Sequence, residues 1–326
     1  MTKIAIVEGD GIGREVIPEA EKILRFFLPN AEFVKVELGF DQWKKTGSAC
    51  SKENMTTLKE MDAVLFGAVT TPPDPEYKSV LLEIRHELDL YANIRPVKSE
   101  SVDLVIVREN TEGLYSGIEE IGEDKSTTLR VITKAGSRRI AEKACSLNIQ
   151  RNQNTPLVIG HKANVLKSDI LFRDTCITVA ESQNLPVRSM FIDALCLDVL
   201  LHPDRYDVIV TTNMFGDILS DACGYLTGGL GMLPSANIGE NHALFEPVHG
   251  SAPDIAGRNI ANPIAAVRSA AMLLEYLGMK TEAEKIEKAV QQTLSLRIVT
   301  PDLGGNASTR DVGENILAKI SEHQRS

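Results

Sequence analysis

The chain has 326 residues, of which 43% are hydrophobic and 25% charged, and its formal net charge is -10. This composition is typical of a soluble globular protein of one or two domains, and the apolar runs are too short to span a bilayer. The acidity argues against nucleic-acid binding, because such proteins need a basic face for the phosphates.

The chain opens on "KIAIVEGDGIGREV", which reads as a buried strand, a glycine cluster and a helix that begins at about Arg14. This layout resembles the turn on which a dinucleotide pyrophosphate rests. The dinucleotide fingerprint requires a third glycine at position 14, where this chain has arginine. The glycines therefore predict a tight strand-to-helix turn and only weakly a Rossmann fold.

Apolar runs bounded by turn residues predict further strands, and segments with apolar residues every three or four positions predict helices. The predicted strands are 3–7, 31–38, 62–69, 102–107, 156–161 and 205–212. The predicted helices are 14–27, 137–150, 262–278, 280–296 and 308–320. Alternating strands and helices indicate an α/β fold on a largely parallel sheet. Composition alone marks no domain boundary.

Three arginines, Arg85, Arg95 and Arg108, cluster in an otherwise acidic chain. One such arginine is usually surface charge. Arg95 and Arg108, however, follow apolar runs and look like residues at strand ends, where α/β proteins place ligand groups.

Asp217 and Asp221 are four residues apart, so on a helix they would lie on one face and repel each other unless a cation lies between them. Mg²⁺ or Mn²⁺, which prefer oxygen ligands, would supply that charge, and Asp193 in "IDALCLD" is a further candidate ligand. Alternatively, Asp217 caps a helix and Asp221 is exposed. Spacing alone does not decide between these interpretations.

Lys162 directly follows the strand-like run "PLVIGH". It is either a surface lysine or, beside carboxylates and a metal, a proton-transfer group. Tyr115 in "ENTEGLYSG" is a candidate acid for the same site, although a lone tyrosine is more often a packing residue.

The segment 243–266, "ALFEPVHGSAPDIAGRNIANPIAA", is too rich in glycine and proline to be one regular element. Loops of this length are usually functional or disordered, and this one is too apolar for disorder. Its backbone could bind phosphate, and Asp254 fits recognition of a ribose diol.

The five cysteines are scattered and never spaced as C-x-x-C, so neither disulfides nor a zinc site is predicted. The strand-like start lacks the pattern of a secretory signal, and we expect a cytoplasmic protein.

The motifs "EGDGIGREV", "NIRP", "VIVRENTEGLY", "HKANVLK", "TTNMFGDILSD", "FEPVHGSAPDIAG" and "TPDLGG" resemble, in this order, those of the isocitrate/isopropylmalate dehydrogenases, the β-decarboxylating dehydrogenases. The resemblance implies an α/β, isopropylmalate dehydrogenase-like two-domain fold that is not a Rossmann fold, with a mixed sheet flanked by helices. It implies a large cofactor-binding domain from residues 1–91 and 229–326. A small inserted domain, residues 92–228, would carry the dimer interface and the metal and catalytic residues.

The resemblance also assigns site residues. Tyr115 and Lys162 match the catalytic pair, and the metal ligands are Asp193, Asp217 and Asp221. The substrate-binding residues are Ser79, Leu81, Leu82, Arg85, Arg95, Arg108 and Asp193. The cofactor-binding residues are Ile12, Glu246, His249, Gly250, Ser251, Ala252, Asp254, Ile255 and Asn262. The "DI" pair at Asp254 and Ile255 favours NAD over NADP.

In such enzymes Lys162 and Asp193 would reach across from a second subunit, so the resemblance implies a homodimer with shared active sites, or a tetramer built from dimers. The expected reaction is NAD-dependent oxidative decarboxylation of a 3-substituted malate. Leu81 and Leu82 favour 3-isopropylmalate, which gives 2-oxoisocaproate in leucine biosynthesis, because an apolar pocket disfavours a third carboxylate. Homoisocitrate or isocitrate is the alternative substrate, in lysine biosynthesis or 2-oxo acid chain elongation. A non-catalytic regulatory paralogue is the alternative from another class.

Overall fold

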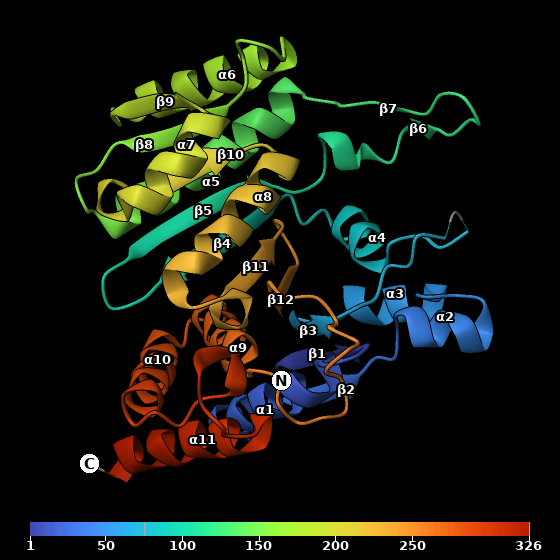
Figure 1. Ribbon diagram of the computed structural model, residues 1–326, viewed down its shortest axis with the longest axis vertical. Helices are drawn as coiled ribbons and strands as arrows, with labels where there is room; N and C mark the ends of the chain where they lie inside the picture. Colours follow the sequence, from blue (N-terminus) through green and yellow to red (C-terminus); the bar gives the residue numbers. More distant parts are fainter. Residues whose placement is uncertain (75, 326) are drawn as a thin grey trace. The chain divides into compact units, whose positions relative to one another are not determined.

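The computed structural model describes residues 1–74 and 76–325 and divides into two compact units (Figure 1). The first unit contains Met1–Leu88, Gly228–Ala236 and Glu240–Ser326, and the second contains Asp89–Thr227 and Asn237–Gly239. The family resemblance implies domain boundaries after residues 91 and 228. It does not predict that Asn237–Gly239 belongs with the second unit. Within the described ranges, no helix combines the length and apolarity that a membrane span requires.

The strands of the first unit follow the order β2, β1, β3, β12, β11. The bounds of the first four are Glu32–Lys35, Lys3–Gly9, Ala63–Ala68 and Ala243–Pro247. β11 spans Pro234–Ile238, and its residues up to Ala236 belong to the first unit. β1 pairs in parallel with β2 and β3, and β3 with β12. Every residue of β3 is buried, as in parallel sheets covered on both faces.

Four long helices form the helical part of this unit: α1 (Gly13–Phe27), α9 (Ile264–Tyr276), α10 (Lys280–Ser295) and α11 (Thr309–Arg325). α1 buries Val16, Ile17, Ala20, Ile23 and Leu24, a single apolar stripe that packs against β1, β3 and α9. Shorter helices are α2 (Phe40–Thr46), α3 (Lys52–Lys59), α4 (Val80–Glu87), η4 (Leu230–Met232) and η5 (Pro301–Leu303).

The strands of the second unit follow the order β4, β5, β10, β8, β9. Their bounds are Ala92–Lys98, Asp103–Glu109, Val208–Thr211, Leu157–His161 and Val187–Phe191. β4 and β5 are antiparallel and the other pairs are parallel, so the sheet is mixed. A small hairpin joins β6 (Glu119–Glu120) to β7 (Thr127–Thr128).

The helices of this unit pack as two pairs, α5 with α6 and α7 with α8. Their bounds are Lys134–Arg151, Ser168–Ser182, Ile192–Leu201 and Asn213–Cys223, with short helices η1 (Leu114–Ser116), η2 (Pro203–Arg205) and η3 (Gly224–Thr227). α5 packs on β5 and β10, and α8 also packs on β5. The strand β5 is therefore buried from Leu104 to Glu109.

The α/β class with a mixed sheet flanked by helices is confirmed, and every predicted strand and helix is present within a few residues of its expected bounds. One prediction is wrong: Arg95 lies in the middle of β4 and not at a strand end. β4 contains polar residues, such as Asn93 and Arg95, that are buried because they are hydrogen-bonded to each other. These polar residues interrupt the apolar pattern from which a buried strand is predicted. The alternative that Asp217 caps a helix is also wrong, since Asp217 lies inside α8.

Candidate active site

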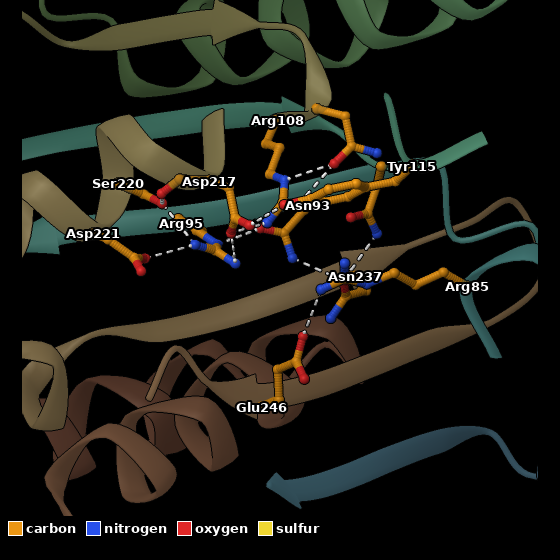
Figure 2. Close-up of polar contacts among 12 residues, drawn as sticks. Arg85, Asn93, Arg95, Arg108, Tyr115, Asp217, Ser220, Asp221, Asn237 and Glu246 are labelled. Atoms are coloured by element: carbon orange, nitrogen blue, oxygen red, sulfur yellow. Dashed lines mark hydrogen bonds and ion pairs between the residues drawn. The ribbon is translucent and has the colours of Figure 1, made fainter. Parts of the chain in front are cut away.

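Two arginines of the β4–β5 ladder face two aspartates of α8 (Figure 2). Arg95 Nη2 lies 3.2 Å from Asp217 Oδ1, and Arg95 Nη1 lies 3.1 Å from Asp221 Oδ1. Arg108 Nη1 donates to the same Oδ1 of Asp217. Asp217 is thus the common partner of both guanidinium groups, which would otherwise repel each other.

Arg108 is fully buried because a glycine and an asparagine make room for it and bind it. A Cβ atom on Gly216 would lie 2.6 Å from Arg108 Cγ, so the arginine stem occupies the space that a larger residue would need. Asn213 Oδ1 accepts from Arg108 Nε at 3.1 Å and Nη2 at 2.7 Å. The guanidinium therefore has one fixed orientation.

Tyr115 joins this group from η1. Its hydroxyl donates to Asp217 Oδ2 at 3.1 Å, and the Arg108 guanidinium carbon lies 5.6 Å from the centre of its ring. The tyrosine is half-buried, so its hydroxyl is held at a carboxylate while the side chain keeps access to solvent. This is the position of a candidate acid.

Asp217 and Asp221 lie one helical turn apart on α8, as expected, and their side chains keep 32% and 50% of their exposure. Burial raises the pKa of Asp221, Arg95 opposes the rise, and Asp217 adds to it. A divalent cation would favour the ionised form of both carboxylates, and their accessible oxygens are the ligand type that Mg²⁺ and Mn²⁺ prefer. The pair fits part of a metal site.

Lys162 and Asp193 form a separate pair. Lys162 Nζ lies 2.6 Å from Asp193 Oδ1, and this hydrogen bond is the main reason that the pKa of Asp193 is lowered. The Lys162 backbone N–H donates to Asp169 Oδ2 at 2.7 Å, and the buried Asp169 also accepts from Arg130. The lysine is therefore anchored directly after β8, and its amine is accessible.

The predicted metal ligands are not all brought together in one chain. Across residues 1–74 and 76–325 there is no group of three His, Cys, Asp or Glu side chains that could hold a metal ion. Asp217 and Asp221 share Arg95, whereas Asp193 pairs with Lys162. That Lys162 and Asp193 complete the site of a second subunit stays a prediction.

The glycine turn of the first unit packs on the backbone of the predicted cofactor loop. The Ile12 N–H donates to the Ser251 carbonyl at 2.9 Å, and a Cβ on Gly11 would lie 2.0 Å from that oxygen. The side chain of Ser251 bonds Thr70 Oγ1 at 2.7 Å. The missing side chain at Gly11 is required here by a protein loop, whereas the glycine cluster taken alone resembles a turn on which a dinucleotide rests.

His249 is the loop residue with an unused polar atom. Its Nδ1 lies 2.9 Å from the Gly250 carbonyl, and its buried Nε2 has no hydrogen-bond partner among the described residues. Burial lowers the pKa of His249, which favours the neutral ring. A polar group of a dinucleotide fits this nitrogen. Around it, Ala252 has a positive φ of 37°, Ile255 is half-buried, and Gly250 and Asp254 are exposed.

Three other predicted ligand residues are bound within the protein. Asn262 Oδ1 accepts from the Ile264 N–H at the start of α9, and its Nδ2 donates to Asp302. Glu246 and Arg85, which the resemblance assigns to cofactor and substrate, form a buried ion pair of 3.2 Å. The structure thus gives both Asn262 and Arg85 partners within the protein.

Ser79 lies at the N-cap of α4 and makes no capping hydrogen bond with its side chain. Leu81 and Leu82 are half-buried, while Val80 and Ile84 point into the core. α4 therefore keeps two leucines partly accessible next to the buried Arg85.

Several residues of the site are not predicted from the sequence. They are Asn93, Asn213, Ser220, Asn237 and, in the glycine turn, Asp10. Asp10 is buried and its carboxylate accepts from the N–H groups of Phe40, Asp41 and Thr70. The signal in the sequence that could have indicated such residues is an asparagine or aspartate among neighbours that are expected to be buried.

Comparison with known proteins gives the same family over nearly the whole chain. Residues 3–316 match the family model described as isocitrate/isopropylmalate dehydrogenase. A homoisocitrate dehydrogenase of Methanocaldococcus jannaschii is 45% identical over 98% of both chains, and a 3-isopropylmalate/3-methylmalate dehydrogenase of the same organism is 46% identical over 99% of this chain and all of the relative. The crystal structure of an isocitrate dehydrogenase from Methylococcus capsulatus superimposes with a TM-score of 0.94 at 37% identity, covering 98% of this chain and 99% of that one. The chain belongs to the isocitrate/isopropylmalate dehydrogenase family and is a β-decarboxylating dehydrogenase that acts on a CH–OH group.

Proposed function

We propose that this enzyme catalyses the NAD-dependent oxidative decarboxylation of a 3-substituted malate, with 3-isopropylmalate as substrate and 2-oxoisocaproate as product. The observation that carries the proposal is the cluster of Arg95, Arg108, Tyr115 and two accessible aspartates, Asp217 and Asp221. Fixed guanidinium groups bind carboxylates, and aspartates one turn apart bind a divalent cation.

We assign substrate binding and proton transfer to the following residues of the chain. Arg95 and Arg108 bind and orient substrate carboxylates, and Arg85 is proposed for the same role. Lys162, directly or through a water, takes the proton of the C2 hydroxyl as hydride leaves C2. After the β-carboxylate departs as CO₂, Tyr115 gives its hydroxyl proton to the enol carbon.

The cofactor and the metal ion would be held by different residues. His249 and the loop that follows it would bind NAD, with Ile12 and Asp254 as further contacts, and Asp217 and Asp221, together with the Asp193 of a second subunit, would hold Mg²⁺ or Mn²⁺. When bound, NAD⁺ accepts the hydride, and the metal stabilises the negative charge that develops on the substrate oxygen.

Leu81 and Leu82 support 3-isopropylmalate, because an apolar contact disfavours a desolvated third carboxylate. Homoisocitrate is the second candidate. It is supported by the similarity to a relative named homoisocitrate dehydrogenase, at nearly the same identity as the relative named for 3-isopropylmalate.

We expect a higher kcat/KM for 3-isopropylmalate than for homoisocitrate, isocitrate, malate or tartrate when NADH absorbance is followed with NAD⁺ and Mg²⁺. Replacing Leu81 by serine should narrow or reverse the preference, since one apolar contact contributes about 1–3 kcal/mol to discrimination. The matched control is Leu296→Ser, at an exposed leucine in the C-terminal part of the chain. A preference for homoisocitrate in the parent enzyme would replace the first substrate by the second.

We further propose that the enzyme is a cytoplasmic homodimer, or a tetramer of such dimers, with shared active sites. Four large apolar side chains of α7, α8 and η3 stay exposed: Leu197 and Leu201 at 62%, Ile218 at 58% and Tyr225 at 82%. The elements that carry them pack against one another, α7 on α8 and α8 on η3, and large exposed apolar side chains grouped in this way suggest an interaction site. Leu197 and Leu201 lie on one face of α7, the helix that also carries Asp193.

Replacing Leu197 by aspartate is expected to give a folded monomer with little activity, because Lys162 and Asp193 would lose the second subunit that they serve. Light scattering coupled to gel filtration measures the mass, and circular dichroism checks folding. Leu296→Asp is the control that should leave the dimer intact. A fully active monomeric variant would argue against shared sites.

A further inference from the structure

Behind Arg95 lies a chain of buried carboxamides. Asn93 Oδ1 accepts from Arg95 Nε at 2.7 Å, and Asn93 Nδ2 donates to Asn237 Oδ1 at 2.8 Å (Figure 2). Asn237 Oδ1 also accepts from Asn110 Nδ2 at 2.9 Å. All three asparagines are almost completely buried, and all belong to the second unit.

The register of the sheet explains why Asn93 can reach both partners. Asn93 and Arg95 are two residues apart on β4 and so lie on the same face, and Asn93 stands opposite Arg108 in the antiparallel ladder. The asparagine therefore lies beside the two arginines of the candidate site and is hydrogen-bonded to Arg95.

The hydrogen bonds that Asn93 makes with Arg95 and Asn237 fix the orientation of its amide. Its oxygen must face the Arg95 guanidinium, which can only donate, and its nitrogen must then face the Asn237 oxygen. An exchanged oxygen and nitrogen would place donor against donor at Arg95 and acceptor against acceptor at Asn237. Asn237 thus holds Asn93 in the one orientation that binds Arg95 Nε.

With Nε bound by Asn93, the other end of the guanidinium is aimed at the site. Its Nη1 donates to Ser220 Oγ at 2.6 Å and to Asp221, and its Nη2 lies beside Asp217. A planar fork with Nε fixed has little freedom to rotate.

We propose that Asn93 and Asn237 are positioning residues that hold the Arg95 guanidinium in the plane that binds a carboxylate of the hydroxy-acid substrate. The inference rests on the proposed role of Arg95 in substrate binding. It goes beyond that role by assigning the geometry of Arg95 to an asparagine from a distant part of the chain, Asn237, through Asn93.

The test compares Asn237→Ala and Asn93→Ala in the full-length enzyme under steady-state conditions. Both variants should raise the KM for the hydroxy acid by about tenfold, because Asn93→Ala removes the hydrogen bond to the charged Arg95 and Asn237→Ala removes the bond that orients Asn93. The KM for NAD⁺ should stay at the parent value. Because KM does not depend on the concentration of active enzyme, a partly unfolded preparation lowers kcat without moving KM.

Two further variants separate the effect of the hydrogen bonds from Asn237 through Asn93 to Arg95, here called the relay, from an effect on general packing. Asn110→Ala removes the other donor to Asn237 and leaves the Asn93–Arg95 branch in place, so its KM for the hydroxy acid should match the parent. Asn237→Asp keeps an acceptor for Asn93 and should restore most of the affinity that Asn237→Ala loses. It also keeps the proposal testable if the alanine variant does not fold.

The outcomes distinguish this inference from the proposed function. If Arg95→Lys raises the KM and both asparagine-to-alanine variants lower only the melting temperature, the relay is wrong and the role of Arg95 stands. If Arg95→Lys itself leaves the KM unchanged, the proposed role of Arg95 is wrong, and the inference falls with it. Equal KM values for Asn93→Ala and Asn110→Ala would also overturn the relay.

Discussion

Replacing Lys162 by methionine is expected to lower kcat by about 10²–10⁴-fold, the usual contribution of a positioned acid or base. Methionine keeps an unbranched stem of similar length and removes only the amine. The backbone of Lys162 is held by Asp169 through its N–H group, so the loop after β8 should keep its conformation. Steady-state NADH production with 3-isopropylmalate measures the loss.

Lys167→Met is the matched control, since Lys167 is an exposed lysine five residues further along the same segment. It should keep the parent kcat. The melting temperature of both variants should stay close to that of the parent, because Asp193 is 66% exposed and pairs open to solvent contribute little to stability. Near-normal turnover of Lys162→Met would remove the lysine from the proposed mechanism.

Replacing Asp217 by asparagine is expected to abolish turnover at ordinary Mg²⁺ concentrations and to lower stability. The carboxylate accepts from Arg95, Arg108 and Tyr115, and asparagine offers a single neutral acceptor oxygen in its place. Arg95 keeps its contact with Asp221, but the two guanidinium groups lose the carboxylate that they share. Loss of hydrogen bonds to charged groups costs about 1.5–3 kcal/mol each, reduced here by the partial exposure of Asp217.

Titration of activity with Mg²⁺ and urea unfolding measure the two effects separately. The matched control is Asp204→Asn, which changes an exposed aspartate of the same unit. It should leave both curves unchanged. An Asp217→Asn enzyme with the parent requirement for Mg²⁺ would exclude Asp217 as a metal ligand, whatever its stability.

Apolar runs predict the buried strands β3 and β5, and an apolar stripe with helical spacing predicts α1. These patterns do not reveal β4, where Asn93, Arg95 and Pro96 interrupt the apolar pattern. Those polar groups are tolerated in the interior because each arginine and asparagine finds a partner there. A strand that carries the polar residues of a site is therefore not predicted from its hydrophobic pattern.

The candidate site is predictable where one motif carries it. Spacing places Asp217 and Asp221 on one helix face, and the position after an apolar run places Lys162 at a strand end. The role of Asn237 is not predictable in this way, because its contacts are with residues more than 120 positions away. Likewise, no pattern in the sequence indicates that Arg85 is paired with Glu246.

The most direct test of the proposed oxidative decarboxylation is the ratio of CO₂ released to NADH formed. Purified enzyme with NAD⁺, Mg²⁺ and 3-isopropylmalate labelled in its β-carboxylate should release one labelled CO₂ for each NADH formed, with neither product when the metal is chelated. If homoisocitrate alone reacts in this ratio, the reaction class stands and the substrate changes. NADH without labelled CO₂ from any 3-substituted malate, or no NADH at all, would contradict the proposed oxidative decarboxylation.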